Sequence, residues 1–179
     1  DLMGEEEMRY RTILADPPWQ QKMSGKWNKH KAPEKIPYQT MTLNDIKMIP
    51  VADYADVGCH LWLWTTNQFL ESGFEVMKSW GFKYLSPIHW VKPSGIGNWF
   101  VHRTQTILFG YKEKCQFNLC RYKPNIIISG DPVRHSQKPE ESYKLIESVS
   151  DPLRLELFAR NIRAGWDVVG NEVTNSIID

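Results

Sequence analysis

The chain has 179 residues, of which 41% are hydrophobic, and this length is sufficient to bury a core. Lys and Arg total 22 against 21 for Asp and Glu, so the net charge of +1 excludes a globally basic nucleic-acid binder. No apolar run approaches the twenty residues of a transmembrane helix, and the acidic start lacks the pattern of a signal peptide. Three cysteines are too few for a disulfide framework and favour a reducing cytoplasm.

The first half of the chain predicts two buried strands and two helices. Short apolar runs predict strands at 12–15 and 59–66, each bounded by polar or turn-forming residues. Thr42 is placed to cap a short helix. Asn67 is placed to cap a longer helix, which Gly81 would end.

The second half predicts further strands and one more helix. A proline followed by two glutamates is typical of a helix start, and it predicts a helix over 139–149. The alternation of strands with helices predicts an α/β sheet that is mostly parallel, although the fourth and fifth predicted strands of the chain could instead form an antiparallel edge. The strands expected here, including that pair at 106–111 and 125–129, are 82–91, 106–111, 125–129, 153–158 and 166–169.

Asp16-Pro17-Pro18-Trp19 follows directly after the first predicted strand, where open α/β sheets bind ligands. Two successive prolines lack N–H groups and fix their backbone angles, so nearby carbonyls are expected to point outward as unpaired acceptors. With the Asp16 carboxylate and the flat Trp19 ring, they suit a planar group that carries an amine, such as adenine. The alternative is a rigid turn with a buried tryptophan.

Further motifs follow Asp16-Pro17-Pro18-Trp19 in order along the chain. Together they resemble the MT-A70-like family of adenine-N6 methyltransferases over roughly residues 10 to 173. The resemblance implies one methyltransferase domain over residues 1–179, with the α/β, Rossmann-like fold of S-adenosylmethionine-dependent methyltransferases and a permuted, beta-class motif order. The matching blocks are Pro37-Tyr38-Gln39-Thr40-Met41, Leu61-Trp62-Leu63-Trp64, Trp90-Val91-Lys92, His135-Ser136-Gln137-Lys138-Pro139-Glu140, Glu156-Leu157-Phe158-Ala159-Arg160 and Gly170-Asn171-Glu172.

The resemblance also implies roles for individual residues. Asp16, Pro17, Pro18 and Trp19 would be catalytic, and Trp19 and Tyr38 would contact the acceptor base. The implied cofactor contacts are Asp16, Lys138, Arg160, Asn161, Arg163, Asn171 and Glu172.

Each of these roles has a structural alternative. Lys138 could be a solvated surface lysine, Arg160 could pair with Glu156, and Asn171 could be a turn residue. Trp62 and Trp64 alternate with leucines and are predicted to belong to the core.

Two stretches are locally basic, 22–35 and 102–123. In the first, Lys26, Lys29 and Lys31 are candidate contacts for nucleic-acid phosphates, although charge runs are commonly solvated faces. No metal is expected, because the histidines show no ligand spacing and Cys115 and Cys120 have no partner pair.

The sequence and its resemblance favour S-adenosylmethionine-dependent methylation of adenine N6 in DNA as the function. The alternatives are the same reaction on RNA, or a catalytically silent nucleic-acid-binding partner subunit. The intact Asp-Pro-Pro-Trp argues against the silent subunit, because such partners in the family tend to have degenerate versions. The catalytic domains of the family commonly work as pairs, so the resemblance implies a homodimer or heterodimer. The aromatic segment 90–100 is a candidate surface for this contact. The expected location is cytoplasmic, with a bacterial or phage origin favoured, or nuclear if the source is eukaryotic.

Overall fold

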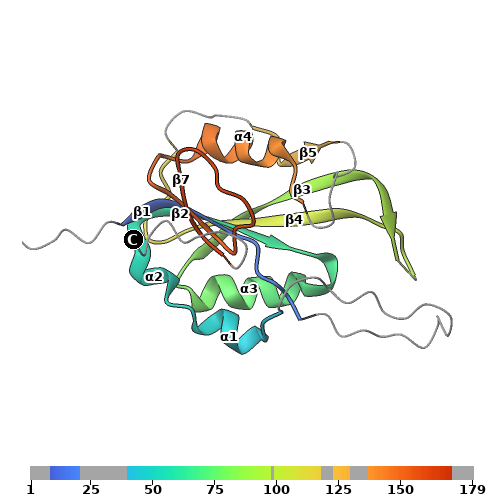
Figure 1. Ribbon diagram of the computed structural model, residues 1–179, viewed down its shortest axis with the longest axis horizontal. Helices are drawn as coiled ribbons and strands as arrows, with labels where there is room; N and C mark the ends of the chain where they lie inside the picture. The colour runs from blue at the N-terminus through green and yellow to red at the C-terminus, as the bar shows by residue number, and fades with distance from the viewer. Residues whose placement is uncertain (1–8, 21–39, 98, 118–122, 130–136, 171–179) are drawn as a thin grey trace, which may run out of the picture.

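The computed structural model describes residues 9–20, 40–97, 99–117, 123–129 and 137–170, which form one seven-stranded sheet with helices on both faces (Figure 1). The strand order is β5-β3-β4-β2-β1-β6-β7. The strands are β1 (Tyr10–Ala15), β2 (Ala55–Thr65), β3 (Lys83–Ile96), β4 (His102–Tyr111), β5 (Ile126–Ile128), β6 (Arg154–Leu157) and β7 (Trp166–Val169). The helices are α1 (Leu43–Met48), α2 (Val51–Tyr54), α3 (Leu70–Ser79) and α4 (Glu140–Val149), and a 3-10 turn, η1 (Asn67–Phe69), precedes α3.

The sheet is mixed. β1 is parallel to β2 and β6, β6 is parallel to β7, and β3 is parallel to β5. β4 is antiparallel to both of its neighbours, β2 and β3. The α/β prediction is therefore confirmed. The alternative that strands 106–111 and 125–129 pair as an antiparallel edge is wrong, because β4 lies inside the sheet and β5 pairs with β3.

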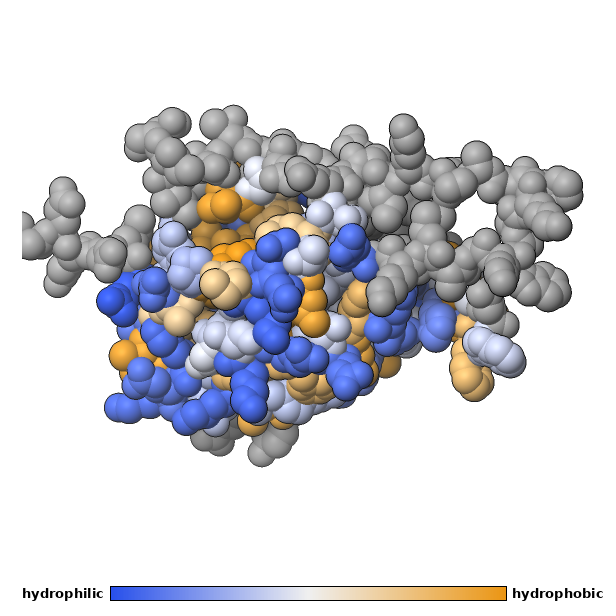
Figure 2. Space-filling view, turned by 90° about the horizontal axis from the view of Figure 1, so that it is seen from below, coloured by the Kyte–Doolittle hydropathy of each residue, from blue (hydrophilic) through white to orange (hydrophobic). Residues whose placement is uncertain are grey.

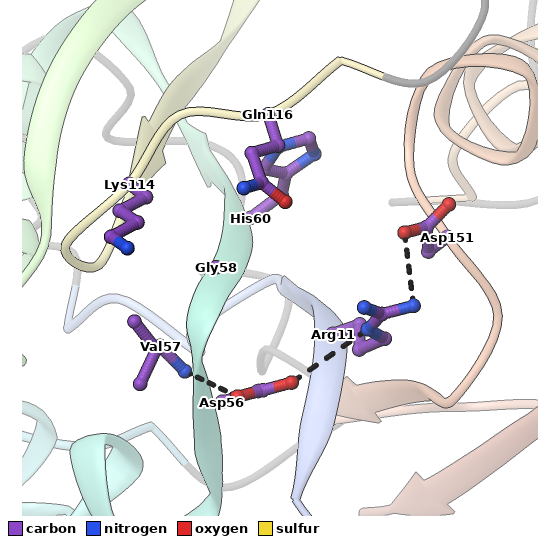
Figure 3. A pocket seen from close by; sticks show the side chains of 8 residues that line it. All are labelled: Arg11, Asp56, Val57, Gly58, His60, Lys114, Gln116 and Asp151. Carbon is purple, nitrogen blue, oxygen red and sulfur yellow. Dashed lines mark hydrogen bonds and ion pairs between the residues drawn. The ribbon is translucent and has the colours of Figure 1, made fainter.

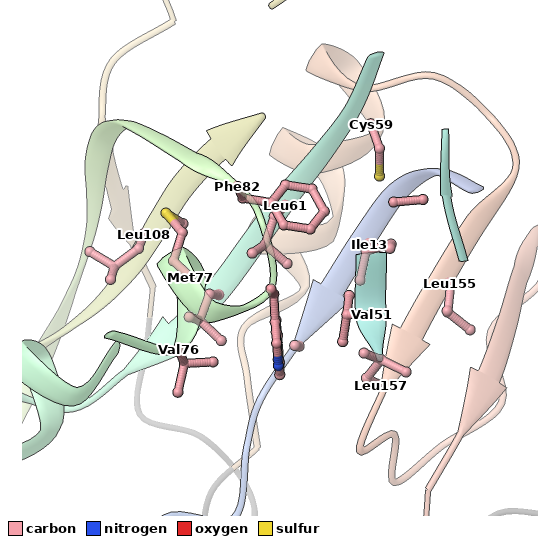
Figure 4. Close-up of a cluster of buried hydrophobic side chains, with 14 of the residues drawn as sticks. Ile13, Val51, Cys59, Leu61, Val76, Met77, Phe82, Leu108, Leu155 and Leu157 are labelled. Atoms are coloured by element: carbon pink, nitrogen blue, oxygen red, sulfur yellow. The ribbon is translucent and has the colours of Figure 1, made fainter. Parts of the chain in front are cut away.

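Alternating side chains of the strands divide the core into two layers. Ile13 and Ala15 of β1 pack in the layer under α1 and α3, which Figure 4 shows with Val76 and Met77 of α3. Leu14, between them, packs in the layer under α4. Trp62 and Trp64 are buried in this second layer, as predicted. The surface over α1 and α3 is mostly hydrophilic (Figure 2).

The helix ends test the sequence signals directly. Thr42 caps α1 by accepting a hydrogen bond from the Asp45 N–H, and Gly81 follows α3 with φ +81°, as predicted. The prediction for Asn67 is wrong. This residue lies in η1, and its amide donates to the Thr104 carbonyl instead of capping α3.

β3 and β4 continue as a long hairpin beyond their neighbours (Figure 1), so both are longer than predicted. Trp90 is buried, so its side chain does not belong to the candidate surface predicted over 90–100. Ile96, Trp99 and Phe100 at the hairpin end are 87%, 95% and 76% exposed. Of the helices in the described ranges, none is long and apolar enough to cross a membrane.

Candidate active site

The sheet has a topological switch point between β1 and β6, because the strands that follow β1 in sequence lie first on one side of it and later on the other. The chain runs from β1 through α1, α2 and β2 on one side, and it returns through α4 to β6 on the other side of β1. At such a switch point the two connections leave opposite faces of the sheet, and in open α/β sheets the ligand crevice lies there, beyond the carboxyl ends of the strands. Asp16 follows the last residue of β1 directly, and Phe158 follows the last residue of β6.

The backbone after Asp16 forms a tight turn. The Trp19 N–H donates to the Pro17 carbonyl at 2.9 Å, and the Met41 N–H donates to the Pro18 carbonyl at 3.0 Å. The expectation of unpaired carbonyls at the two prolines is therefore wrong, because backbone N–H groups pair with both. A carbonyl oxygen has two lone pairs, so one hydrogen bond leaves each carbonyl able to accept a second.

Asp16 and Lys138 form the central ion pair of the candidate site. The Lys138 ammonium lies 3.1 Å from the Asp16 carboxylate and donates to Gln105 Oε1 at 3.1 Å. It also lies 5.0 Å from the centroid of the Trp64 ring. The Lys138 side chain is only 11% exposed, so the alternative of a solvated surface lysine is wrong. The structure thus brings together two residues that are 122 positions apart and that the sequence assigned to one site.

The Trp19 ring lies in the core beneath the site. It is 7% exposed and stacks on Phe69, with ring centroids 5.6 Å apart and planes 11° from parallel. The structure therefore agrees with the alternative of a buried tryptophan in a rigid turn, and it does not present the indole as an open platform. The contact between Trp19 and a base stays a prediction.

Glu156 lies close enough to Asp16 to be influenced by its charge, although the sequence analysis did not assign it to the candidate site. It lies opposite Leu14 in the pairing of β6 with β1, is 8% exposed, and accepts a hydrogen bond from the Tyr143 hydroxyl at 2.8 Å. Burial, together with the negative charge of Asp16, raises the pKa of Glu156 to about 7, although the Tyr143 hydrogen bond and the positive charge of Arg163 oppose the shift. The sequence does carry one signal for this position, because Glu156 is a charged residue between Leu155 and Leu157 in a predicted strand.

The loop between β6 and β7 carries the remaining described candidates. Arg160 is partly buried and Asn161 is exposed. Arg163 forms ion pairs with Glu140 and Glu147 on α4. Of the residues assigned to base or phosphate contacts, Tyr38, Lys26, Lys29 and Lys31 lie outside the described residues, as do Asn171 and Glu172 on the cofactor side.

Gly170, the residue before Asn171, lies against the backbone of this loop. A side chain at Gly170 would collide with the Ala159 carbonyl oxygen, and the Ala159 N–H donates to the Val169 carbonyl at 3.0 Å. The close approach therefore requires glycine at position 170, and it fixes the end of β7 beside Ala159.

A polar pocket of about 220 Å³ lies at the opposite end of the sheet (Figure 3). Its lining includes Arg11, Asp56 and Asp151, and Arg11 pairs with Asp151 at 3.2 Å. Arg11 is the second residue of β1, and Asp16 follows the last one. Because a strand rises by about 3.3 Å per residue, most of the length of β1 lies between the pocket and the candidate site. The pocket is distinct from the crevice at the switch point.

The second basic stretch, 102–123, is partly structural. The Lys112 ammonium donates to the carbonyls of Ala52 and Ala55 at 2.9 Å, at the end of α2. These hydrogen bonds hold Lys112 within the fold, so it is not a free contact for a phosphate. The described part of the chain holds no group of three His, Cys, Asp or Glu side chains that could bind a metal ion.

The strand order, with crossovers on both faces of the sheet, defines a Rossmann-like α/β protein in which the Asp16 turn lies at the switch point. The MT-A70 family model matches residues 10–172. The chain therefore belongs to the MT-A70 family of S-adenosylmethionine-dependent methyltransferases, as the sequence motifs predicted.

Comparison with curated proteins gives the same family. The chain is 32% identical to a putative N6-adenosine-methyltransferase MT-A70-like protein of Medicago truncatula over 187 residues. The aligned region covers 97% of this chain and 27% of that protein. The chain is 29% identical to the human N6-adenosine-methyltransferase catalytic subunit METTL3, over 92% of this chain and 28% of that protein. It is 30% identical to the human N6-adenine-specific methyltransferase METTL4, over 92% of this chain and 37% of that protein. The chain thus spans well under half the length of these relatives.

Proposed function

We propose that this chain is a methyltransferase domain that transfers a methyl group from S-adenosylmethionine to the N6 amine of adenine in DNA. The observation that carries the proposal is the Asp16–Lys138 pair in the crevice at the switch point. RNA is the second candidate substrate, because the Medicago relative and human METTL3 are named for adenosine. The intact turn from Asp16 to Trp19 argues against a catalytically silent subunit.

The donor groups in the crevice suit the methionine end of the proposed cofactor. That end carries a carboxylate and an ammonium group. The Lys138 ammonium would hold the carboxylate, and the Asp16 and Glu156 carboxylates provide acceptors for the ammonium. The Arg160 and Asn161 side chains, with Asn171 and Glu172 after β7, would contact the adenosine end. When bound, S-adenosylmethionine supplies a methyl group on a positively charged sulfur.

The Asp16 turn would orient and activate the acceptor amine. The lone pair of the adenine amine is delocalised into the ring, so the nitrogen is a weak nucleophile. Asp16 would accept one amine hydrogen, and the second lone pair of the Pro17 carbonyl would accept the other. These contacts favour the pyramidal nitrogen of the transition state and stabilise the positive charge that develops on it. The nitrogen then releases one proton, for which the Asp16 carboxylate is the acceptor within hydrogen-bonding reach.

The grip on nucleic acid is proposed to come from the basic loop, through Lys26, Lys29 and Lys31. Their joint replacement by Ala should weaken binding almost equally for all sequences and flatten its dependence on salt, measured by fluorescence anisotropy of a labelled oligonucleotide. Cofactor affinity should stay as in the wild type. Normal oligonucleotide binding over a range of salt would show that this loop is only a solvated face.

Assembly and location complete the proposal. The exposed hairpin end around Trp99 and Phe100 would form part of a dimer contact, as either a homodimer or a heterodimer. Cys59 and Cys115 are free thiols, which supports a reducing compartment, the cytoplasm of a bacterial or phage-infected cell or the nucleus of a eukaryotic one.

A methyl-transfer assay with matched oligonucleotides would test the proposal. The chain would be incubated with S-adenosylmethionine and single-stranded DNA, duplex DNA or RNA of one base sequence, and N6-methyladenine would be measured by mass spectrometry. The proposal predicts the fastest transfer to DNA. Faster transfer to RNA would support the second candidate, and binding of S-adenosylmethionine without transfer to any substrate would support the silent subunit.

A further inference from the structure

The loop of residues 158–165 has a backbone that neighbouring contacts must hold in place. Phe158, at its start, has φ +64°, and Gly165, near its end, has φ +80°. Glycine adopts this left-handed conformation readily, whereas for phenylalanine it is unfavourable. Such a conformation persists only where the surrounding structure fixes it.

Arg163 of this loop makes polar contacts with two carboxylates on α4. Its Nη1 and Nη2 atoms donate to the two carboxylate oxygens of Glu140 at 2.9 and 2.8 Å, and its Nε donates to Glu147 at 2.9 Å. The guanidinium also lies 4.4 Å from the centroid of the Tyr143 ring. The same Glu147 oxygen accepts a hydrogen bond from Trp166 Nε1 at 2.8 Å. Arg163 therefore connects the loop to α4, and Glu147 connects α4 to the first residue of β7.

The three partners of Arg163 lie on one face of α4. Glu140, Tyr143 and Glu147 are spaced i, i+3 and i+7, which places them in a row along the helix. We call Arg163 and these three residues the Arg163 cluster. The cluster also reaches the catalytic crevice, because the Tyr143 hydroxyl donates to Glu156 and because α4 starts two residues after Lys138.

We propose that Arg163 is a positioning residue that fixes the 158–165 loop against α4, so that Arg160 and Asn161 are held at the correct place relative to Lys138. This inference rests on the proposed function, in which that loop and Lys138 share one cofactor. It replaces the direct cofactor contact that the family resemblance implied for Arg163. The reason is geometric: the guanidinium directs donors from three of its nitrogens to two carboxylates, and its central carbon lies over the Tyr143 ring.

Coupling between the members of the cluster distinguishes positioning from direct contact. S-adenosylmethionine would be titrated by calorimetry into the wild type, Arg163→Gln, Glu147→Gln and the double variant. Positioning predicts that each single variant weakens affinity by about tenfold and that the double variant is little weaker than either single one. In turnover assays, the KM for the cofactor should rise by more than kcat falls, and Arg163→Lys should recover part of the affinity. Glu141→Gln, an exposed carboxylate on the same helix, is the matched control and should bind as the wild type does.

Hydrogen exchange of the cofactor-free protein provides a second measurement that does not depend on activity. Glu140→Gln, a milder change at the exposed end of the cluster, should accelerate amide exchange in residues 158–165 and leave β1 and β2 unchanged. Unchanged exchange there, or a Glu147→Gln variant with wild-type cofactor affinity, would overturn the inference. If the wild type itself does not bind S-adenosylmethionine, the proposed function fails, and the inference fails with it.

Discussion

Replacement of Glu156 by Gln is expected to stabilise the protein at neutral pH but not at acidic pH. Glu156 is buried, and its Oε1 accepts the Tyr143 hydroxyl hydrogen, a bond that the Gln carbonyl oxygen can also accept. The substitution therefore keeps the shape and the acceptor and removes only the titratable proton. Any difference between the two proteins that changes with pH reports the ionisation of Glu156.

The size and sign follow from the pKa of Glu156. The ordinary value is 4.5, and burial beside Asp16 raises the folded-state pKa to about 7. Below pH 4.5 the carboxyl is protonated in both the folded and the unfolded chain. As the pH rises towards 7 only the unfolded chain loses the proton, so the free energy of unfolding of the wild type falls. At about 1.4 kcal/mol per pKa unit, the loss reaches about 3 kcal/mol and is constant above pH 7.

Urea denaturation of both proteins at a series of pH values from 4 to about 8 would measure this effect. The unfolding free energy of Glu156→Gln minus that of the wild type should increase by about 3 kcal/mol over the range. In an Asp16→Asn background the increase should be smaller, because the charge of Asp16 contributes to the shift. Glu71→Gln, at an exposed position of α3, is the control and should differ from the wild type by less than about 0.5 kcal/mol throughout. A pH-independent difference for Glu156→Gln would refute the reasoning.

Two further predictions concern the neighbours of Glu156. Lys138→Met keeps a side chain of similar length and removes the ammonium that pairs with Asp16, so calorimetry should show S-adenosylmethionine affinity reduced at least tenfold, about 1.4 kcal/mol; unchanged affinity would show that Lys138 lies outside the cofactor site. Trp19→Ala removes a buried ring that stacks on Phe69 and should lower the free energy of unfolding in urea by about 3–5 kcal/mol, whereas a loss under 1 kcal/mol would contradict its assignment to the core.

Local sequence signals predicted the fold well wherever one short-range interaction decides the structure. The apolar run before Asp16 forms β1, the Thr42 side chain caps α1, and Gly81 ends α3 with a positive φ. Asn67 shows the limit of such signals. Its amide donates to the Thr104 carbonyl on β4, 37 residues away, and this tertiary contact outweighs the local preference for a helix cap.

The candidate site shows the same division between local and distant interactions. The motif at Asp16 and the resemblance at Lys138 predicted two members of one site, and the structure places them 3.1 Å apart. The motif alone could not show that the Trp19 ring packs on Phe69, because its burial depends on η1 and α3. The partners of Arg163 likewise lie on α4, which no spacing within the loop reveals.

The measurement that tests the central proposal most directly compares methyl transfer by the wild type, Asp16→Asn and Asp53→Asn on one adenine-containing oligonucleotide. Asp53 is an exposed carboxylate on α2, remote from the crevice in sequence and structure, and serves as the matched control. If Asp16 accepts a hydrogen of the reacting amine, its replacement should slow formation of N6-methyladenine by about 10²–10⁴-fold, while the circular dichroism spectrum and the Asp53→Asn rate match the wild type. An Asp16→Asn variant that is folded and transfers methyl groups at the wild-type rate would contradict the proposed mechanism.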